Sequence, residues 1–259
     1  MKGFILLLKF MTRFPIPIEP EYDSKKLGNS IKFFPFVGII IGVSLYIIYY
    51  FGRIIIPSPY ILASILVLAE VIMTGALHLD GLADTFDGIF SYRSKQKMLE
   101  IMKDSRLGTN GALSLIIYFF FKILLLAGLD TNFGFHAMGI AVLITPVIAR
   151  ANSVLNCAVG KYAKPVGMAK DFVKETTRQG ATFAVLSSLV FIFLIQGVLL
   201  PVLNPIHLVN IAFVIHVLGI YFAKLMDRKI GGITGDTLGA ILELSEILFL
   251  LGLYISFSF

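Results

Sequence analysis

The sequence predicts an all-α integral membrane protein, built as a bundle of about seven transmembrane helices. Three observations predict this fold class. The mean hydropathy of the 259-residue chain is +0.88, and 57% of its residues are hydrophobic. Only 15% of the residues are charged, whereas a soluble domain carries about 25%. Apolar runs of about 18 or more residues recur, and their continuity is typical of membrane helices rather than of β-barrel strands.

The predicted helices follow one another through short turns or longer polar loops. Pro57 separates the first helix from the second, residues 130–132 turn the chain between the third and the fourth, and Pro201 separates the fifth from the sixth. Because helices in a membrane must pack together, we expect one domain over residues 1–259. The helices are predicted at residues 35–52, 59–78, 111–129, 134–151, 181–200, 206–226 and 238–257.

The segment before the first helix, residues 1–34, is predicted to be amphipathic or re-entrant. Its apolar patch ends at Lys9 after about five residues, and no small-residue cleavage site follows, so a secretory signal peptide is not indicated. The single cysteine, Cys157, excludes an intramolecular disulfide and a metal site made of several cysteines.

Lysine and arginine residues are concentrated in four segments. Residues 1–34, 79–110, 150–180 and 224–237 carry 20 of the 22 basic residues. Seven crossings place all four segments on one side, which the positive-inside rule assigns to the cytoplasm. We therefore expect a plasma-membrane protein with its N-terminus and these loops in the cytoplasm and its C-terminus outside. The net charge of +6 then reflects topology, and no nucleic-acid partner is indicated.

The first candidate site segment reads TGALHLDGLADTFDG, residues 74–88. Asp80, Asp84 and Asp87 are spaced i, i+4 and i+7, so they share one face of a helix. Like charges at this spacing repel unless a cation lies among them, and clustered carboxylate oxygens suit Mg²⁺. Gly81 has no side chain, so a ligand can approach the backbone closely at this position. The alternative interpretation is a solvated helix end.

The second candidate segment reads MKDSRLGTNGA, residues 102–112, and opens the third helix. Asp104 fits a fourth carboxylate ligand, and Arg106 fits a bidentate contact to phosphate. Gly108 and Thr109 can present backbone N–H groups to an anion at a helix N-terminus. The alternative is an ordinary helix cap followed by a topology-setting arginine.

The third candidate segment reads RKIGGITGDTLGAILELSE, residues 228–246, and enters the last helix. Asp236 follows Gly235, and Glu243 lies seven residues later on the same helical face. Carboxylates inside membrane helices are costly and are functional candidates by default. The alternatives are an N-cap for Asp236 and a buried polar contact for Glu243.

Three further polar residues lie near or within the predicted helices. Glu70 and Lys122 are intramembrane charges, and we expect them to pair with each other and stabilise the bundle. His78 precedes Asp80 by two residues. It fits a general base or a phosphate contact, and it equally fits a helix-end histidine with a structural hydrogen bond.

The three candidate segments are distant in sequence, yet all are predicted at helix ends on one face of the membrane. Carboxylates, glycines and an arginine that converge in this way indicate a site for metal ions and a diphosphate. The chemistry that follows is phosphoryl transfer, in which the leaving group departs as a nucleotide or phosphate.

The same three stretches resemble the signature segments of the cobalamin synthase family, whose members are adenosylcobinamide-GDP ribazoletransferases. The resemblance extends to LLKFMTRFPIP and IKFFPFVGIIIG near the N-terminus, so it covers most of the chain. It implies a Mg²⁺-dependent enzyme of the final stage of cobamide biosynthesis. Such an enzyme joins adenosylcobinamide-GDP to α-ribazole or its 5′-phosphate and releases GMP, with the ribose 3′-hydroxyl attacking the phosphate attached to the cobinamide.

The candidate residues then take the following roles. The general base is Asp84, Asp87 or His78, and Arg106 stabilises the developing negative charge. The hypothetical Mg²⁺ ligands are Asp80, Asp84, Asp87, Asp104 and Asp236. The hypothetical substrate contacts are Gly81, Arg106, Gly108, Thr109, Gly235 and Glu243.

Two other interpretations stay open at this point. The DGLADTFDG core also resembles the aspartate motif of CDP-alcohol phosphotransferases, so a generic membrane phosphotransferase with a lipid or alcohol acceptor is the first alternative. An ion or cobamide transporter is the second, although charges confined to one face argue against it. Membrane lipids are expected partners, and an oligomer is compatible with the sequence.

Overall fold

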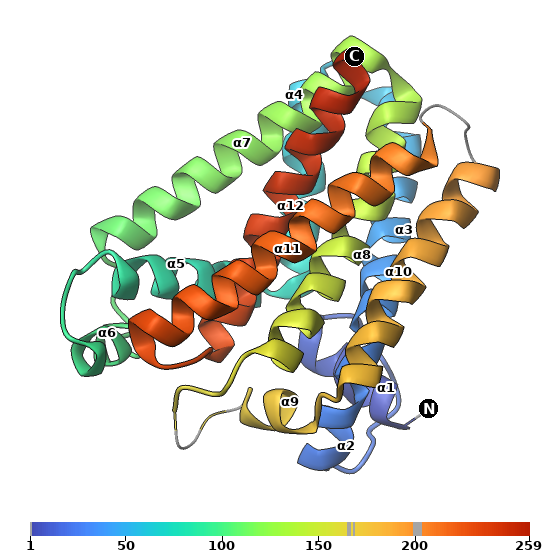
Figure 1. The fold of residues 1–259 in the computed structure, drawn as a ribbon. Coiled ribbons are helices and arrows are strands. Elements are labelled where there is room, and N and C mark those ends of the chain that lie inside the picture. Colours follow the sequence, from blue (N-terminus) through green and yellow to red (C-terminus); the bar gives the residue numbers. More distant parts are fainter. Residues whose placement is uncertain (1, 165–166, 168, 199–203) are drawn as a thin grey trace.

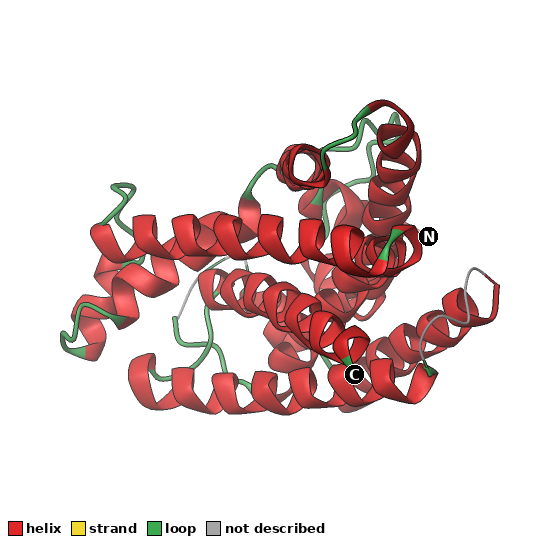
Figure 2. Ribbon diagram, turned by 90° about the horizontal axis from the view of Figure 1, so that it is seen from above, coloured by secondary structure: helices red, strands yellow, loops and turns green. Residues whose placement is uncertain are grey.

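The protein is all-helical in a computed structural model that describes residues 2–164, 167, 169–198 and 204–259. Figure 2 shows the helices from above, joined by short loops. Among the described residues the only β contact is an isolated parallel bridge between Tyr162 and Ile233. The predicted fold class is therefore confirmed.

Seven long helices form the bundle within the described residues. Six stretches of this part of the chain are long and apolar enough to span a membrane, and α4 together with α5 makes a further candidate that is bent by 93°. The bundle helices are α3 (Phe34–Ile55), α4 (Pro59–Thr74), α7 (Thr109–Phe133), α8 (Phe135–Val159), α10 (Arg178–Val198), α11 (Pro205–Ile230) and α12 (Gly235–Ser258).

The second predicted span differs from the observed one, because helix α4 ends at Thr74 instead of residue 78. Gly75 and Ala76 both have positive φ angles, +63° and +58°, which end the helix and turn the chain sharply. The chain then continues as α5 (Leu77–Ile89), which carries all three aspartates of the first candidate segment. The bend therefore sets these acids across the end of the bundle.

The chain runs back and forth between two ends of the bundle (Figure 1). The N-terminus and the short helices lie at one end, and the C-terminus lies at the other. Within the described residues, all four basic segments of the sequence reach the end that holds the N-terminus, as the charge pattern predicts. The short helices at this end are α1 (Lys2–Met11), α2 (Ser24–Ser30), the 3-10 turn Ile31–Phe33, α5, α6 (Lys95–Ile101) and α9 (Lys170–Glu175).

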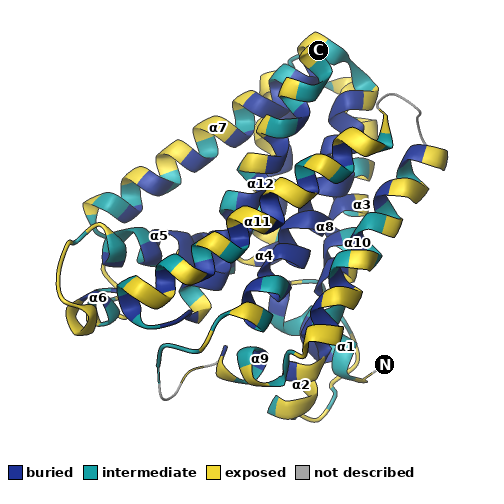
Figure 3. Ribbon diagram, in the orientation of Figure 1, coloured by how far each residue is buried: buried dark blue, intermediate teal, exposed yellow. Residues whose placement is uncertain are grey.

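Helix α8 forms the centre of the bundle, and residues 137–154 are buried without interruption (Figure 3). Helix α3 packs closely against it through two glycines. A Cβ on Gly38 would lie 2.5 Å from the carbonyl oxygen of Pro146, and one on Gly42 would lie 2.6 Å from that of Leu143. Small residues at helix contacts are typical of membrane bundles, because packing rather than the hydrophobic effect drives association in lipid.

Candidate active site

Helices α5 and α12 meet at the end of the bundle that holds the N-terminus, and their contact depends on two glycines. A Cβ on Gly81 would lie 2.7 Å from the carbonyl oxygen of Asp236, and one on Gly239 would lie 2.9 Å from that of His78. Neither helix could approach the other as closely with a larger residue at these positions. The close contact brings the first and third candidate segments together, as the sequence predicts.

An acidic cluster, which we define as Asp80, Asp84 and Asp236, forms where these helices meet. Asp80 is exposed, and Asp84 and Asp236 are partly buried. Asp84 lies within electrostatic reach of Asp80, Asp236 and Asp87. Carboxylates gathered in this way repel one another, so the cluster favours a bound cation.

Asp87, the third aspartate of α5, caps the N-terminus of α7. Its two carboxylate oxygens each accept a 2.8 Å hydrogen bond, one from the backbone N–H of Gly108 and one from that of Gly111. A Cβ on either glycine would lie 2.4 Å from an Asp87 carboxylate oxygen. The predicted anion site at this helix N-terminus therefore holds the carboxylate of the protein itself.

Asp104 and Arg106 lie in the loop between α6 and α7 and pair with each other. The guanidinium donates two hydrogen bonds to the carboxylate, at 3.0 Å from Nε and 2.6 Å from Nη2. This guanidinium, together with the backbone N–H of Arg106, lowers the pKa of Asp104 to about 2. Because the Arg106 side chain is 87% exposed, it is free to exchange this partner for a phosphate.

Lys164 enters the acidic cluster, which the sequence pattern does not predict. Its ammonium lies 3.1 Å from a carboxylate oxygen of Asp236, and the Lys164 side chain is only 12% exposed. Lys164 lies in the loop between α8 and α9, and two backbone hydrogen bonds hold this loop to Ile233. The Ile233 N–H donates to the Lys161 carbonyl, and the Ala163 N–H donates to the Ile233 carbonyl. A lysine that sets membrane topology and a lysine that belongs to a site look alike in the sequence, because both lie in a basic loop. Only the fold shows that Lys164 reaches the acidic cluster.

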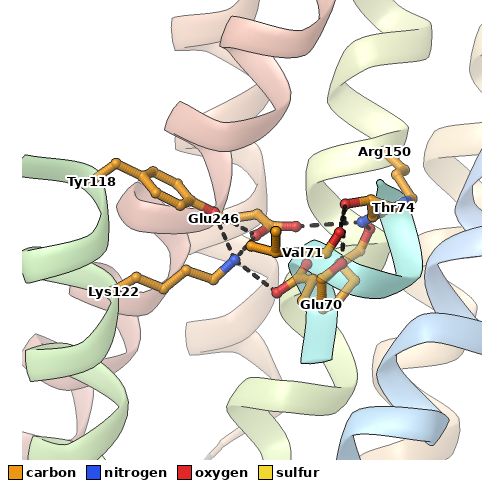
Figure 4. A network of polar contacts seen from close by, with 8 residues as sticks. Glu70, Val71, Thr74, Tyr118, Lys122, Arg150 and Glu246 are labelled. Atoms are coloured by element: carbon orange, nitrogen blue, oxygen red, sulfur yellow. Dashed lines mark hydrogen bonds and ion pairs between the residues drawn. The ribbon is translucent and has the colours of Figure 1, made fainter. Parts of the chain in front are cut away.

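A second group of charges lies inside the bundle, as Figure 4 shows. Lys122 on α7 donates to Glu70 on α4 at 2.7 Å and also to Glu246 on α12. Tyr118 and Arg150 complete this network, with Arg150 Nη1 at 3.3 Å from Glu246. The predicted Glu70–Lys122 pair is confirmed, and the network joins helices α4, α7, α8 and α12.

Two further polar residues of this region are buried in the bundle. Arg150 belongs both to the end of the predicted helix 134–151 and to the basic segment 150–180. Helix α8 continues past it to Val159 and holds its side chain 1% exposed within the bundle. The polar run that begins at Arg150 is typical of a loop. In the folded bundle only some of its polar atoms have partners, because Nε and Nη2 of Arg150 and Oδ1 of Asn156 have none among the described residues. Glu243, a candidate substrate contact, is buried in α12 beside Tyr118.

The remaining candidates lie at helix starts and beside a cavity. Thr109 and Gly235 are exposed first residues of α7 and α12. His78 is buried in α5, and its Nδ1 has no hydrogen-bond partner among the described residues. It faces a cavity that Asp80 and Asp236 also line.

A divalent cation fits the acidic cluster by its chemistry. The donors are all carboxylate oxygens, which Mg²⁺ prefers, and they carry more negative charge than Lys164 alone balances. Within the described part of the chain, no three His, Cys, Asp or Glu side chains are arranged closely enough to hold a metal ion. Binding would therefore involve rotation of these aspartate side chains toward a common point.

Comparison with known proteins identifies the family. The family model for cobalamin-5-phosphate synthase matches residues 3–254. An adenosylcobinamide-GDP ribazoletransferase of Fusobacterium nucleatum is 47% identical, and the match covers 96% of each chain. Enzymes of the same name from Clostridioides difficile and Alkaliphilus oremlandii are 38% and 36% identical over 98% of each chain. No solved structure matches the chain. The chain belongs to the cobalamin-5-phosphate synthase family.

Proposed function

We propose that this protein transfers the phosphocobinamide part of adenosylcobinamide-GDP to the ribose hydroxyl of α-ribazole or its 5′-phosphate. The family match over residues 3–254 supports this function, together with the name shared by relatives that match the chain over nearly its whole length. The structural observation that carries it is the acidic cluster where α5 meets α12. The reaction is the final stage of cobamide assembly.

The reaction exchanges one phosphate ester for another. The ribose oxygen forms a bond to the phosphorus attached to the cobinamide, and the bond from that phosphorus to the bridging oxygen of the diphosphate breaks. GMP leaves with the bridging oxygen, and the hydroxyl proton passes to a base. The protein's contribution is to position the two substrates in line and to balance the charge of the diphosphate.

In this proposal the acidic cluster holds Mg²⁺. When bound, Mg²⁺ would supply neutralisation of the diphosphate charge. Asp80, Asp84 and Asp236 would be the principal ligands, because the close contact of α5 with α12 brings them within electrostatic reach of one another. Asp87 stays in the proposed set, since each of its oxygens keeps a lone pair after accepting a backbone hydrogen bond. Asp104 joins it only after releasing Arg106.

The chain's own groups then act on the donor and the acceptor. Lys164 and Arg106 are the cations that contact the phosphates, and the N-terminus of α12 at Gly235 adds a favourable dipole, whereas that of α7 is occupied by Asp87. Asp84 is the preferred proton acceptor. Both oxygens of Asp87 are already engaged by backbone amides, and His78 lies buried behind the cluster.

The proposed orientation follows the basic segments. The site lies at the end of the bundle that carries them, so the positive-inside rule places that end in the cytoplasm. The protein is then a multi-pass protein of the plasma membrane that takes both substrates from the cytoplasmic side. This arrangement suits two water-soluble, charged substrates.

The test is transfer by the purified protein in detergent, supplied with adenosylcobinamide-GDP, α-ribazole and Mg²⁺. We expect cobalamin and GMP in equal amounts. Asp80→Asn and Asp84→Asn should each lower the rate by at least about 100-fold, because loss of a metal ligand removes several kcal/mol of charge stabilisation. Glu100→Gln, an exposed acid on α6, is the control and should retain activity.

Two outcomes would contradict the proposal. One is full activity in Asp80→Ala and Asp84→Ala. The other is transfer to a lipid or simple alcohol acceptor without transfer to α-ribazole, which would favour a generic phosphotransferase. A panel of acceptors in the same assay distinguishes the two.

A further inference from the structure

A cavity of about 150 Å³ opens beside the acidic cluster. Its walls come from the N-terminal helix α1, from α3, α5, α8 and α12, and from the short helix α9. Asp80 and Asp236 lie at its rim, so the cavity and the cluster share one border. The rest of the wall is mainly apolar, and its principal residues are Phe10, Met11, Phe34, Leu77, Cys157 and Phe172.

The side chains of the wall favour an aromatic ligand. Phe10 and Phe172 meet edge to face, with their ring centroids 5.6 Å apart, and Phe34 lies on the wall formed by α3. An apolar cavity of about 150 Å³ is large enough to bind benzene. Aromatic rings add favourable contacts to a flat ligand beyond the area that they bury. A small ring system with few polar groups therefore matches both the volume and the wall.

One polar side chain on the wall is left without a partner. His78 is 6% exposed, its Nδ1 has no hydrogen-bond partner among the described residues, and its ring lies 5.9 Å from that of Phe34. A buried polar atom without a partner costs free energy, and a ligand that ordered the imidazole or supplied a partner atom would recover it. The imidazole of His78 is thus a polar group on the wall whose Nδ1 has no partner, in addition to Ser153, Asp80 and Asp236.

We infer that this cavity binds the aromatic base of the ribonucleoside acceptor, with the ribose directed toward Asp80 and Asp236. The inference rests on the proposed function and names the position of one substrate within that site. A base held between Phe34 and the Phe10–Phe172 pair places its ribose hydroxyls beside the acidic cluster. His78 then acts as a positioning residue, and α1 and α9 form the cover of the base.

The cavity also discriminates between the bases of the two substrates, the guanine of the donor and the base of the acceptor. Guanine carries several donors and acceptors on its ring edges, and most of them would be buried without partners against Phe and Met side chains. A benzimidazole-type base has one free ring nitrogen and an apolar edge. The GDP part of the donor is therefore excluded, and it binds outside the cavity.

The single cysteine makes a direct test possible in the unmodified protein. Cys157 lines the cavity and is 2% exposed. Its labelling by a small methanethiosulfonate is measured in detergent with EDTA and without donor, in the presence of benzimidazole riboside, guanosine or neither. We expect saturating benzimidazole riboside to slow labelling at least about tenfold, as occupancy above 90% requires, and guanosine to leave it unchanged. Equal rates with and without the riboside would overturn the inference.

A fluorescent reporter provides a second readout, because the chain contains no tryptophan. Phe10→Trp places one at the cavity, and Phe183→Trp places one on an exposed face of α10. Benzimidazole riboside should change the emission of the first variant in a saturable way and leave the second unchanged. An equal response of both variants would show binding elsewhere and would contradict the assignment.

The two buried histidines form a matched pair for the positioning role. His78→Ala should raise the acceptor KM about tenfold, equivalent to about 1.4 kcal/mol of lost binding, and leave the donor KM unchanged. His216 is also buried with one unpartnered ring nitrogen, but it contacts Asn152 and is not on the cavity wall. His216→Ala should leave both KM values unchanged. An equal rise of the donor and acceptor KM in His78→Ala would contradict the positioning role.

These measurements separate the inference from the function on which it rests. Transfer to α-ribazole without protection of Cys157 would refute the base site and leave the proposed reaction standing. Protection of Cys157 without transfer to any nucleoside acceptor would refute the proposed reaction. Protection by detergent or lipid chains, with none by the riboside, would assign the cavity to the membrane and overturn the inference.

Discussion

Helix α12 contributes carboxylates to the buried network and to the acidic cluster, and these two regions differ in how far their carboxylates are paired with cations. In the buried network, Glu246 faces both Lys122 and Arg150, Glu70 pairs with Lys122, and all four side chains are at most 10% exposed. In the acidic cluster, Lys164 pairs with Asp236 and attracts Asp84, no second ion pair is found among the described residues, and all three carboxylates belong to exposed or partly exposed residues. The fold supplies partners where a buried charge would cost stability and withholds them where a ligand can supply the charge.

This contrast predicts that substitutions in the two regions affect different properties. Removing a partner from the network leaves a charge buried in the bundle, so it should cost stability. Removing an acid from the cluster relieves repulsion, so it should cost activity alone. The predictions below begin with the largest expected effect.

The largest stability effect is expected for Lys122→Met, which leaves Glu70 and Glu246 without their shared ammonium. Breaking a buried ion pair on one side costs about 3–5 kcal/mol. The free energy of unfolding is measured by SDS titration in mixed micelles. Lys26→Met, at a surface pair with Asp23, is the control and should leave unfolding unchanged. Similar behaviour of the two variants would refute the structural role of the network.

The largest activity effect without a stability cost is expected for Asp84→Asn. The transfer rate should fall by at least about 100-fold, because a proposed metal ligand and proton acceptor is lost. The unfolding midpoint should stay the same or rise, since the remaining acids repel each other less. Activity and unfolding are measured on one preparation. A clear drop in the midpoint would mean that Asp84 belongs to the packing of α5 instead.

An intermediate effect on both properties is expected for Gly81→Ala. The added methyl would lie 2.7 Å from the Asp236 carbonyl oxygen, so α5 and α12 must move apart. Overpacking of this kind costs about 1–3 kcal/mol, and the displaced acids should also lower the transfer rate. The control is Gly197→Ala on α10, where nothing lies within 4 Å of the new Cβ. An active and stable Gly81→Ala protein would show that the close contact is not needed.

The smallest effect is expected for Lys164→Met, which removes the ammonium paired with Asp236 in the cluster. Stability should change little, while the KM for the anionic donor should rise about tenfold because one phosphate contact is lost. Lys161→Met removes an exposed lysine of the same loop, which pairs with Asp227 of α11, and it should leave the donor KM unchanged. Equal KM values for the two variants would remove Lys164 from the site.

Much of this arrangement follows from sequence pattern. Hydropathy and the basic segments predict the helix bundle, and the i, i+4, i+7 spacing predicts a shared face for Asp80, Asp84 and Asp87. The pairing of Glu70 with Lys122 is predictable because two lone charges in apolar helices have few other partners. These features depend on periodicity and composition, which are local properties.

Other features depend on contacts between distant segments. The 93° bend after Thr74 lies at Gly75 and Ala76. The positive φ angle of Ala76 cannot be predicted from the sequence, because residues other than glycine rarely adopt one. Asp87 caps a helix that begins 22 residues later, so its carboxylate and that of Asp84 serve different purposes despite one motif. The pairing of Arg150 with Glu246 cannot be predicted from the local sequence, because only the folded bundle brings the two residues together.

The central claim is that the acidic cluster where α5 meets α12 binds a divalent cation for phosphoryl transfer. Mn²⁺ binding to the purified protein, followed by electron paramagnetic resonance without substrates, tests it most directly. We expect saturable binding that Asp80→Asn and Asp236→Asn each weaken at least about tenfold, in line with lost carboxylate ligands. Glu100→Gln should bind Mn²⁺ as the unmodified protein does. Unchanged Mn²⁺ binding in both aspartate variants would contradict the claim.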